Sequence, residues 1–257
     1  MFDTHAHLTD PPLYSDLAGV IARAAAAGIS LMAVPSTDQA TSQQALDLAR
    51  RFPDMVLAAA GLHPGKVVAG SATALSWLAD FLAGGGFSAV GETGLDARIP
   101  SADLDAQEQV FRLHAGLARE AGLPLIVHVR GAYDRVFRVL ESMGRGGPGG
   151  VLHAFGGSTE MAARLFRLGF LRGVGGGVTR PQAVKLRDAI RRTPLDAMVL
   201  ETDSPYIATA QTPAGQVEPR DIVQVRDTIA QLQGVPTSEV EARTTAAARA
   251  LFRLETP

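Results

Sequence analysis

The chain has 257 residues, of which 46% are hydrophobic and 19% are charged, and its formal net charge at pH 7 is -2. This composition excludes an intrinsically disordered chain, and the lack of cysteine excludes disulfide frameworks, zinc fingers, iron–sulfur clusters and thiol nucleophiles. Near-neutral charge argues against a broad basic face for nucleic acid, and an aromatic content of 5% argues against a base-stacking platform, but a nuclease that holds its substrate through metal ions remains open.

The N-terminal residues have neither the basic region nor the apolar segment of a signal peptide. The longest apolar stretches, such as Ala24–Ala27 and Ile29–Val34, are far shorter than the roughly 20 residues that a membrane span needs. We therefore expect a soluble, cytoplasmic protein with no membrane association. The sequence does not define its oligomeric state, and a monomer is compatible with it.

Short apolar, β-branched runs alternate along the chain with Ala-, Leu- and Arg-rich segments of helical periodicity. Eight runs are predicted strands: Phe2–Thr4, Ile29–Val34, Met55–Ala60, Phe87–Gly91, Leu125–Val129, Val151–His153, Phe170–Val174 and Ala197–Glu201. Helices are predicted between them, for example over Ala106–Ala121 and Met161–Leu168. In the remaining segment, Pro219–Leu254, we expect a long amphipathic helix followed by shorter helices over Pro236–Arg243 and Thr244–Phe252.

The spacing of the runs indicates the fold. Positions 5, 34, 63 and 92 are successively 29 residues apart, and each marks the end of an apolar run. One strand–loop–helix unit occupies about 30 residues, so eight units with no polar linker predict a single (β/α)8 TIM-barrel domain over residues 1–257. The alternative is a doubly wound open sheet, which would not require matched polar residues at the strand ends.

Metal-binding residue types occur at the C-terminal ends of the apolar runs. They are His5, His7, His63, Glu92, His128, His153 and Asp203. In a barrel these strand ends converge on the face where the fold carries out its chemistry. Five of the six histidines lie there, whereas His114 lies in the middle of a predicted helix and is interpreted as structural.

The His5-x-His7 pair has a specific geometric meaning, because residues i and i+2 of a strand point to the same side, about 6–7 Å apart. Taken singly, each residue also has a structural interpretation: His128 as a hydrogen-bonded core histidine, Glu92 or Asp203 as a cap of the following segment. The joint pattern favours a metal site. Its predicted ligands are His5, His7, Glu92, His128, His153 and Asp203.

Charge arithmetic indicates the substrate. Four neutral histidines and two carboxylates supply -2 against +4 from two divalent ions, and a hydroxide between them leaves about +1, which favours an anionic substrate such as a phosphodiester. The two lysines, Lys66 and Lys185, lie in loop or helix contexts, so Glu92 rather than a carbamylated lysine would bridge the ions. This ligand set accepts Mg, Mn or Zn, and equally Fe or Ni.

Two further residues are predicted to bind substrate. His63 could contact a phosphate, fix a ligand or shape its own loop. Arg130 lies two residues after His128, and its guanidinium matches phosphate geometry, although it could instead pair with Glu92 or Glu201. Glu201 itself is expected to support a metal ligand.

Six motifs follow one another in a characteristic order: Asp3-Thr4-His5-Ala6-His7-Leu8, Gly61-Leu62-His63-Pro64, Gly91-Glu92-Thr93-Gly94-Leu95-Asp96, His128-Val129-Arg130, His153-Ala154-Phe155 and Leu200-Glu201-Thr202-Asp203-Ser204-Pro205-Tyr206. Together they resemble the TatD family of metal-dependent hydrolases (TatD-like deoxyribonucleases). The resemblance runs from residue 3 to the C-terminal Ala250-Leu251-Phe252, which is essentially the whole chain.

The resemblance implies an amidohydrolase-like (β/α)8 barrel with a binuclear metal site. One ion would be held by His5, His7, Glu92 and Asp203, and the other by Glu92, His128 and His153. Asp203 would also be the general base, so Asp203 and Glu92 are the expected catalytic residues. The implied activity is that of a metal-dependent deoxyribonuclease, often exonucleolytic, acting on DNA ends or single strands.

Two positions depart from the family pattern. Ala97-Arg98 stands where an aromatic residue is usual after Gly-Leu-Asp, and Thr244-Thr245-Ala246-Ala247 stands where Thr-x-x-Asn is common. The first departure concerns substrate contacts, and Arg98 could meet a phosphate instead. The alternative function is therefore an ester or amide hydrolase acting on another anionic substrate such as aminoacyl-tRNA. A non-enzymatic binding module is disfavoured because every expected ligand position is filled.

Overall fold

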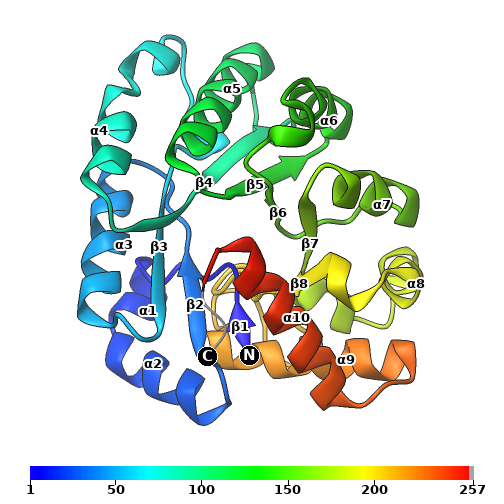
Figure 1. Ribbon diagram of the computed structural model, residues 1–257. Helices are drawn as coiled ribbons and strands as arrows, with labels where there is room; N and C mark the ends of the chain where they lie inside the picture. Colours follow the sequence, from blue (N-terminus) through cyan, green and yellow to red (C-terminus); the bar gives the residue numbers. More distant parts are fainter. Residues whose placement is uncertain (255–257) are drawn as a thin grey trace.

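Eight parallel strands form the centre of the molecule (Figure 1). The computed structural model describes residues 1–254. Neighbouring strands in the sheet are neighbours in the chain, from first to last. They are β1 (Phe2–Asp3), β2 (Leu31–Val34), β3 (Val56–Ala60), β4 (Phe87–Asp96), β5 (Leu125–Arg130), β6 (Gly150–Leu152), β7 (Phe170–Val174) and β8 (Met198–Leu200).

The first and last strands also meet. The backbone N–H of Thr4 donates a hydrogen bond of 3.0 Å to the carbonyl of Leu200, and Ala6 forms a bridge with Ser204. The sheet is therefore a nearly closed barrel, which confirms the (β/α)8 prediction. An open doubly wound sheet is excluded, because it would leave two unpaired edges.

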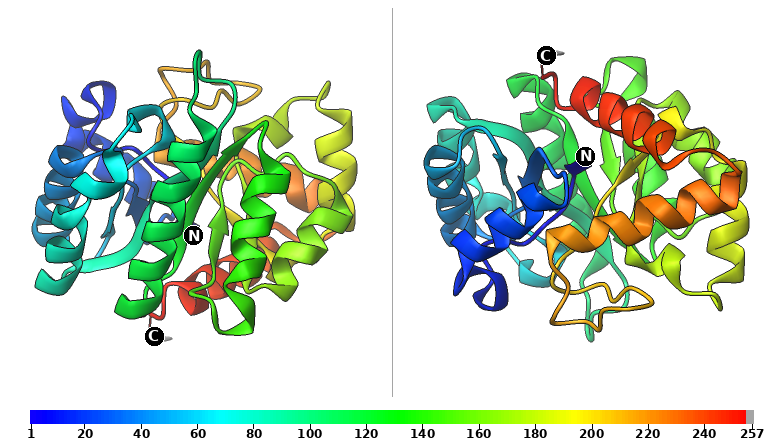
Figure 2. Two further views of the ribbon diagram at one scale, coloured as in Figure 1. Left: turned by 90° about the horizontal axis from the view of Figure 1, so that it is seen from above. Right: turned by 90° about the horizontal axis from the view of Figure 1, so that it is seen from below.

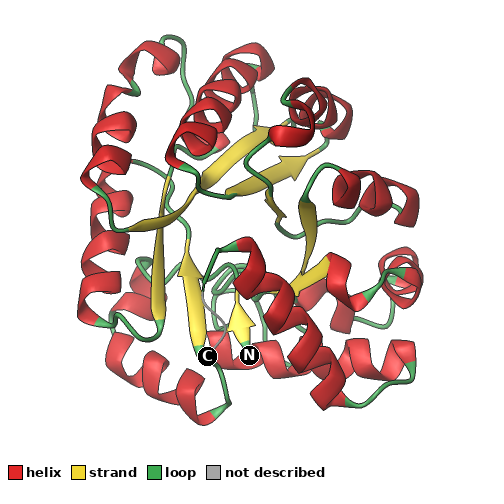
Figure 3. Ribbon diagram, in the orientation of Figure 1, coloured by secondary structure: helices red, strands yellow, loops and turns green. Residues whose placement is uncertain are grey.

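Helices surround the barrel and alternate with its strands (Figure 3). They are α1 (Pro11–Tyr14), α2 (Leu17–Ala26), α3 (Gln39–Arg51), α4 (Ser76–Gly84), α5 (Leu104–Ala121), α6 (Tyr133–Ser142), α7 (Thr159–Arg167), α8 (Val184–Arg192), α9 (Ile222–Gln233) and α10 (Thr237–Leu251). In the described part of the chain, no helix combines the length and hydrophobicity that crossing a bilayer requires.

Two helices begin two residues earlier than the sequence predicts, because polar side chains cap them. Asp103 accepts hydrogen bonds from the backbone of the first turn of α5, and Ser158 does the same for α7. Most strand limits differ from the prediction by one or two residues; the exception is β4, which continues to Asp96 instead of ending at Gly91.

The C-terminal segment differs more from the prediction. It contains α9, a short turn and then one continuous α10, so the predicted break between Arg243 and Thr244 is wrong. The buried Thr244 does not interrupt the helix, because its hydroxyl donates a 2.7 Å hydrogen bond to the Val240 carbonyl one turn earlier. α10 lies beside the N-terminus, at the end of the barrel where the strands begin (Figure 2).

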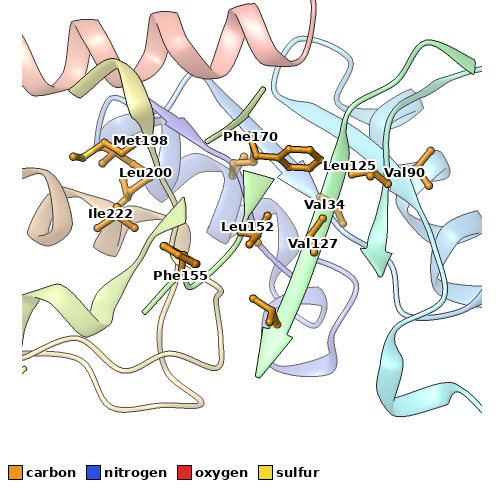
Figure 4. Packing of buried hydrophobic residues seen from close by; sticks show 14 of the residues in the cluster. Val34, Val90, Leu125, Val127, Leu152, Phe155, Phe170, Met198, Leu200 and Ile222 are labelled. Carbon is orange, nitrogen blue, oxygen red and sulfur yellow. The ribbon is translucent and has the colours of Figure 1, made fainter. Parts of the chain in front are cut away.

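Apolar side chains form two layers. Outward-facing residues such as Val90, Leu125 and Phe170 pack between the strands and the surrounding helices (Figure 4). Inward-facing residues fill the lower barrel, where they contact Ala248 and Phe252 at the end of α10. The lower barrel is thus a solid core that supports whatever lies above it.

Candidate metal centre

Side-chain alternation along the strands delivers polar residues to the upper barrel. On β5, Ile126 belongs to the inner apolar layer, and His128 and Arg130, two and four residues later, line a cavity above it. His153 follows Val151 of the same inner layer in the same way. Along both of these rows, the inward-facing residues therefore change from apolar to polar toward the C-terminal end.

The cavity lies at the C-terminal ends of the strands and has a volume of about 630 Å³. His5 is fully buried beneath it. The lining residues are His7, Thr37, His63, Glu92, Asp96, His128, Val129, Arg130, His153, Ala154, Asp203, Tyr206 and Ile207. Every site residue expected from the sequence thus lies in this cavity or directly under it.

The carboxylate of Glu92 lies between two pairs of histidines. One of its oxygens, Oε1, is 2.8 Å from His128 Nδ1 and 2.9 Å from His153 Nε2. The other oxygen, Oε2, is 3.5 Å from His5 Nε2 and 3.7 Å from His7 Nε2. A carboxylate with this arrangement can be shared between two cations, one on each side.

Asp203 completes the pair formed by His5 and His7. Its Oδ1 is 3.3 Å from His7 Nε2 and 3.7 Å from His5 Nε2. The backbone of Asp203 has a φ of +49°, a conformation that Asp tolerates better than most residues, and its N–H donates a 2.8 Å hydrogen bond to the His5 carbonyl. β1 and the segment after β8 therefore position this group together.

Asp3 is a site-supporting residue that the sequence analysis did not single out. Its buried carboxylate accepts hydrogen bonds from the backbone N–H of His5 (3.2 Å) and Thr202 (3.0 Å), and from the hydroxyl of Thr202 (2.7 Å). Burial raises its pKa to about 7. An acidic residue inside an apolar first strand, just before His-x-His, was the available signal.

The buried carboxylates of the cluster favour positive charge beside them. Burial raises the pKa of Glu92, but the charges on His153 and His5 and hydrogen bonds from neighbouring imidazoles outweigh it, so this pKa lies well below its ordinary value. Burial likewise raises the pKa of Asp203, but the hydrogen bond with His7 and the charges on neighbouring histidines outweigh it, so this pKa is also lowered. Burial lowers the pKa of His153, but the charge on Glu92 raises it overall to about 10. The cluster therefore attracts cations.

The cluster fits divalent metal ions. Its donors are imidazole nitrogens and carboxylate oxygens, in three groups whose ligand atoms lie within 4.8 Å of one another: His5, Glu92 and His153; His5, His7 and Asp203; His63, Glu92 and His128. His5 Nε2 and His7 Nε2 are 3.1 Å apart, as are His128 Nδ1 and His153 Nε2. Two imidazoles bound to one tetrahedral ion at 2.0–2.1 Å would be separated by about 3.3 Å.

His63 lies at the edge of the cluster. Its Nδ1 accepts a 2.9 Å hydrogen bond from the Gly65 N–H, and its Nε2 is 3.7 Å from Glu92 Oε1. Its ring packs edge-on against His128, and burial lowers its pKa to about 4. The side chain is therefore positioned both to shape its loop and to face a bound group.

Arg130 and Asp96 form a pair at the mouth of the cavity. The Arg130 guanidinium is 3.6 Å from Asp96 Oδ2, so its acidic neighbour is neither Glu92 nor Glu201. Its side chain keeps 63% of its exposure, which leaves it able to meet an anion. The sequence analysis assigned Asp96 no role, and its predicted strand ended at Gly91, five residues before it.

Gly94 explains why β4 continues. Its φ is +134°, and a Cβ there would clash with the His128 carbonyl oxygen of the adjacent strand. Glycine therefore permits β4 and β5 to approach closely and carries Asp96 beside His128.

Glu201 and His114 occupy supporting positions. Glu201 Oε1 accepts a 2.5 Å hydrogen bond from the Ala154 N–H and is 3.9 Å from His153 Nδ1, which places it next to a cluster histidine. His114 is buried in α5, where its Nδ1 contacts the Val110 carbonyl (2.8 Å) and its Nε2 accepts from the Leu62 N–H (2.9 Å). Its contacts are those of a structural histidine, as the sequence indicated.

Comparisons with known proteins agree with this geometry. A family model described as TatD related DNase matches residues 2–253. The chain is 33% identical to the uncharacterized metal-dependent hydrolase YabD of Bacillus subtilis, over 99% of both chains. It is 31% identical to a protein of Erwinia tasmaniensis named 3'-5' ssDNA/RNA exonuclease TatD, over 99% of this chain and 100% of that one.

A solved structure shows the same architecture. The crystal structure of YJJV, a TatD homolog from Escherichia coli K12, superposes with a TM-score of 0.91 at 31% identity, covering 99% of this chain and 98% of that chain.

Proposed function

Because the chain belongs to the TatD family of metal-dependent hydrolases, we propose that its histidine–carboxylate cluster holds two divalent ions and hydrolyses phosphodiester bonds in DNA, from the ends of single strands. The family model is described as a DNase, and a relative that matches along the full chain carries the name of a single-strand exonuclease. The relative YabD, in contrast, is named only as a hydrolase. The substrate class is therefore the part of the proposal that most needs a test.

The arrangement of Glu92 carries the proposal. Its two oxygens face different histidine pairs, so His5 and His7 with Asp203 would hold one ion, and the pair on β5 and after β6 would hold the other. When bound, such ions supply Lewis acidity to a water molecule and to the phosphoryl oxygens of a substrate, so no nucleophile from the protein is required.

Asp203 is the proposed general base. Its Oδ1 faces His5 and His7, whereas Oδ2 takes no part in those contacts, and the side chain lines the cavity. With its pKa lowered, the carboxylate is ionised at neutral pH and can accept a proton from water at Oδ2.

Cationic and neutral donors at the mouth would bind the substrate. The exposed guanidinium of Arg130 can form paired hydrogen bonds with a phosphate, and His63 faces the cavity beside Glu92. The additional carboxylate at the mouth, Asp96, is accompanied by the positive charge of Arg130. Because these two charges cancel, the site with two divalent ions would keep the positive net charge deduced from its six ligands and would still favour an anionic substrate.

The test is a substrate panel with end-labelled single-stranded DNA, duplex DNA, single-stranded RNA and an aminoacyl ester of RNA. Each substrate is assayed after chelation and after return of Mg²⁺, Mn²⁺ or Zn²⁺. We expect progressive shortening of single-stranded DNA that chelation abolishes and divalent ions restore. Asp203→Asn should be inactive, and His114→Gln, which changes the histidine outside the cluster, should remain active.

Two results would contradict the proposal. Cleavage that persists in a fully demetallated sample would exclude the metal mechanism. Hydrolysis of the aminoacyl ester with no cleavage of any nucleic acid strand would assign the site to ester chemistry instead.

A further inference from the structure

Asp96 is a buried carboxylate with partners on several sides. It ends β4, and only 4% of its side chain is exposed. Its Oδ2 is 3.2 Å from His128 Nε2, and its Oδ1 accepts a 2.8 Å hydrogen bond from the Arg98 N–H. Its own backbone N–H donates a 2.9 Å hydrogen bond to Gln107 Oε1 on α5. The carboxylate is therefore fixed in place independently of any ion.

The His128 ring faces two ways. Its Nδ1 points into the cluster, 2.8 Å from Glu92 Oε1, and its Nε2 points outward to Asp96. A neutral imidazole carries one N–H, and an ionised carboxylate can only accept. Glu92 Oε1 and Asp96 Oδ2 can both accept that proton. An ion in the cluster would take up the Nδ1 lone pair, and Asp96 is then the acceptor for a proton on Nε2.

The other histidines of the cluster present the opposite nitrogen. His5, His7 and His153 each direct Nε2 at a cluster carboxylate. The outward Nδ1 atoms of His5 and His153 have no hydrogen-bond partner within the described residues 1–254. A carboxylate within hydrogen-bond distance of the outward nitrogen is thus a feature that distinguishes His128 from these two, since the carboxylate of Glu201 is 3.9 Å from His153 Nδ1.

We propose that Asp96 is a positioning residue for the β5 side of the metal centre. It holds His128 in the tautomer and orientation that binds an ion through Nδ1. The inference rests on the proposed metal centre. Outer carboxylates of this kind typically contribute 10- to 100-fold to metal affinity.

A purely structural role would have a different signature. If Asp96 only ended the strand, its loss would lower the stability of the fold and weaken both ions alike. A positioning role weakens the ion held by Glu92, His128 and His153, and leaves the ion beside His5 and His7 at its original affinity.

The experiment titrates the demetallated protein with Zn²⁺ against a competing chromophoric chelator. We expect two ions per chain in the wild type. In Asp96→Asn one ion should keep its affinity, and the other should bind about 10- to 100-fold more weakly. Arg130→Gln is the matched control, since it removes the other neighbour of the same carboxylate, and it should keep both ions.

A second measurement does not depend on the variant folding. Nitrogen-15 NMR of the histidines in the Zn²⁺-loaded wild type should show His128 with its proton on Nε2, and His5, His7 and His153 with theirs on Nδ1. A proton on Nδ1 of His128 would overturn the inference, as would an Asp96→Asn variant that binds both ions as the wild type does or loses both equally.

The outcomes separate the inference from the proposed function. A wild type that binds no ion would refute the metal centre and the inference together. Two ions in the wild type without nuclease activity would refute only the proposed substrate. Two unaltered ions in Asp96→Asn would refute only the positioning role.

Discussion

The two ends of the barrel interior are built from the same strands but in opposite ways. At the lower end, inward residues such as Ile126, Val151 and Val199 pack against Phe252, which directly follows α10. At the upper end, two residues further along β5, His128 enters a cluster of imidazoles and carboxylates. Along β5, a residue of the apolar core and a residue of the polar cluster are thus only about 7 Å apart.

The upper end also holds unsatisfied and strained groups. At the upper end, the buried atoms His5 Nδ1, His153 Nδ1 and Glu201 Oε2 have no hydrogen-bond partner within residues 1–254. Ala154 and Asp203 have positive φ angles there. Such features cost stability and persist where the surrounding structure enforces them. The apolar lower end supplies that support, so substitutions at the two ends should have separable effects.

The largest effect is expected at the upper end, from Glu92→Ala. In the proposed centre Glu92 is shared by both ions, so removing its carboxylate should release both and reduce activity by more than about 100-fold. This exceeds the loss expected when only an outer partner of a ligand is altered. The fold should remain, because no apolar contact of the lower core is lost. Elemental analysis and a rate measurement on the same sample check this, and an unchanged metal content would contradict it.

Phe252→Ala, at the lower end, should reduce stability and leave metal binding intact. Phe252 is 4% exposed, and its ring centroid lies 5.1 Å from that of Phe2. Truncation should lower the free energy of unfolding by about 3–5 kcal/mol and leave the number of bound ions unchanged. Urea denaturation measures the loss. Phe166→Ala, at a half-exposed position on α7, is the control and should cost less than about 0.5 kcal/mol.

His114, the buried histidine outside the cluster, should contribute to stability in a pH-dependent way. Burial lowers its pKa from the ordinary value of 6.5 to about 4 in the folded protein. Below pH 6.5 the unfolded chain binds this proton more readily than the folded protein does. The contribution of neutral His114 to the free energy of unfolding is therefore fully present above pH 6.5 and is lost as the pH falls toward 4. The loss amounts to about 3 kcal/mol.

The measurement compares the unfolding free energies of the wild type and His114→Gln at several pH values. The advantage of the wild type should shrink between pH 6.5 and 4. Parallel curves would show that His114 does not titrate with unfolding.

The smallest effect is expected from Arg130→Gln at the rim. Since 63% of the side chain is exposed, solvent screens its contact with a phosphate. We expect KM for single-stranded DNA to rise about two- to tenfold while kcat changes by less than about twofold. A large fall in kcat with unchanged KM would instead place Arg130 in the chemical step.

The sequence predicted the features that follow from periodicity. On β5, the position of His128 at the end of the apolar run placed it at the C-terminal end of the barrel, and the regular spacing of His5, His63 and Glu92 indicated repeated strand–helix units. These predictions succeed because one strand–helix unit occupies about 30 residues and the C-terminal ends of the strands converge at one end of a barrel.

Features that depend on contacts between distant segments were not predicted. The extension of β4 to Asp96 requires Gly94 to approach β5 closely, and the residues around Gly94 do not predict this contact. Asp3 acts through Thr202, almost 200 residues away. The continuity of α10 through Thr244 depends on a hydrogen bond that the propensity of threonine alone does not reveal.

The metal centre is tested most directly by anomalous X-ray diffraction from crystals grown with excess Mn²⁺ or Zn²⁺. We predict two peaks on opposite sides of the Glu92 carboxylate, one beside His5, His7 and Asp203 and the other beside His128 and His153. Well-diffracting crystals with no peak at either position would contradict the account.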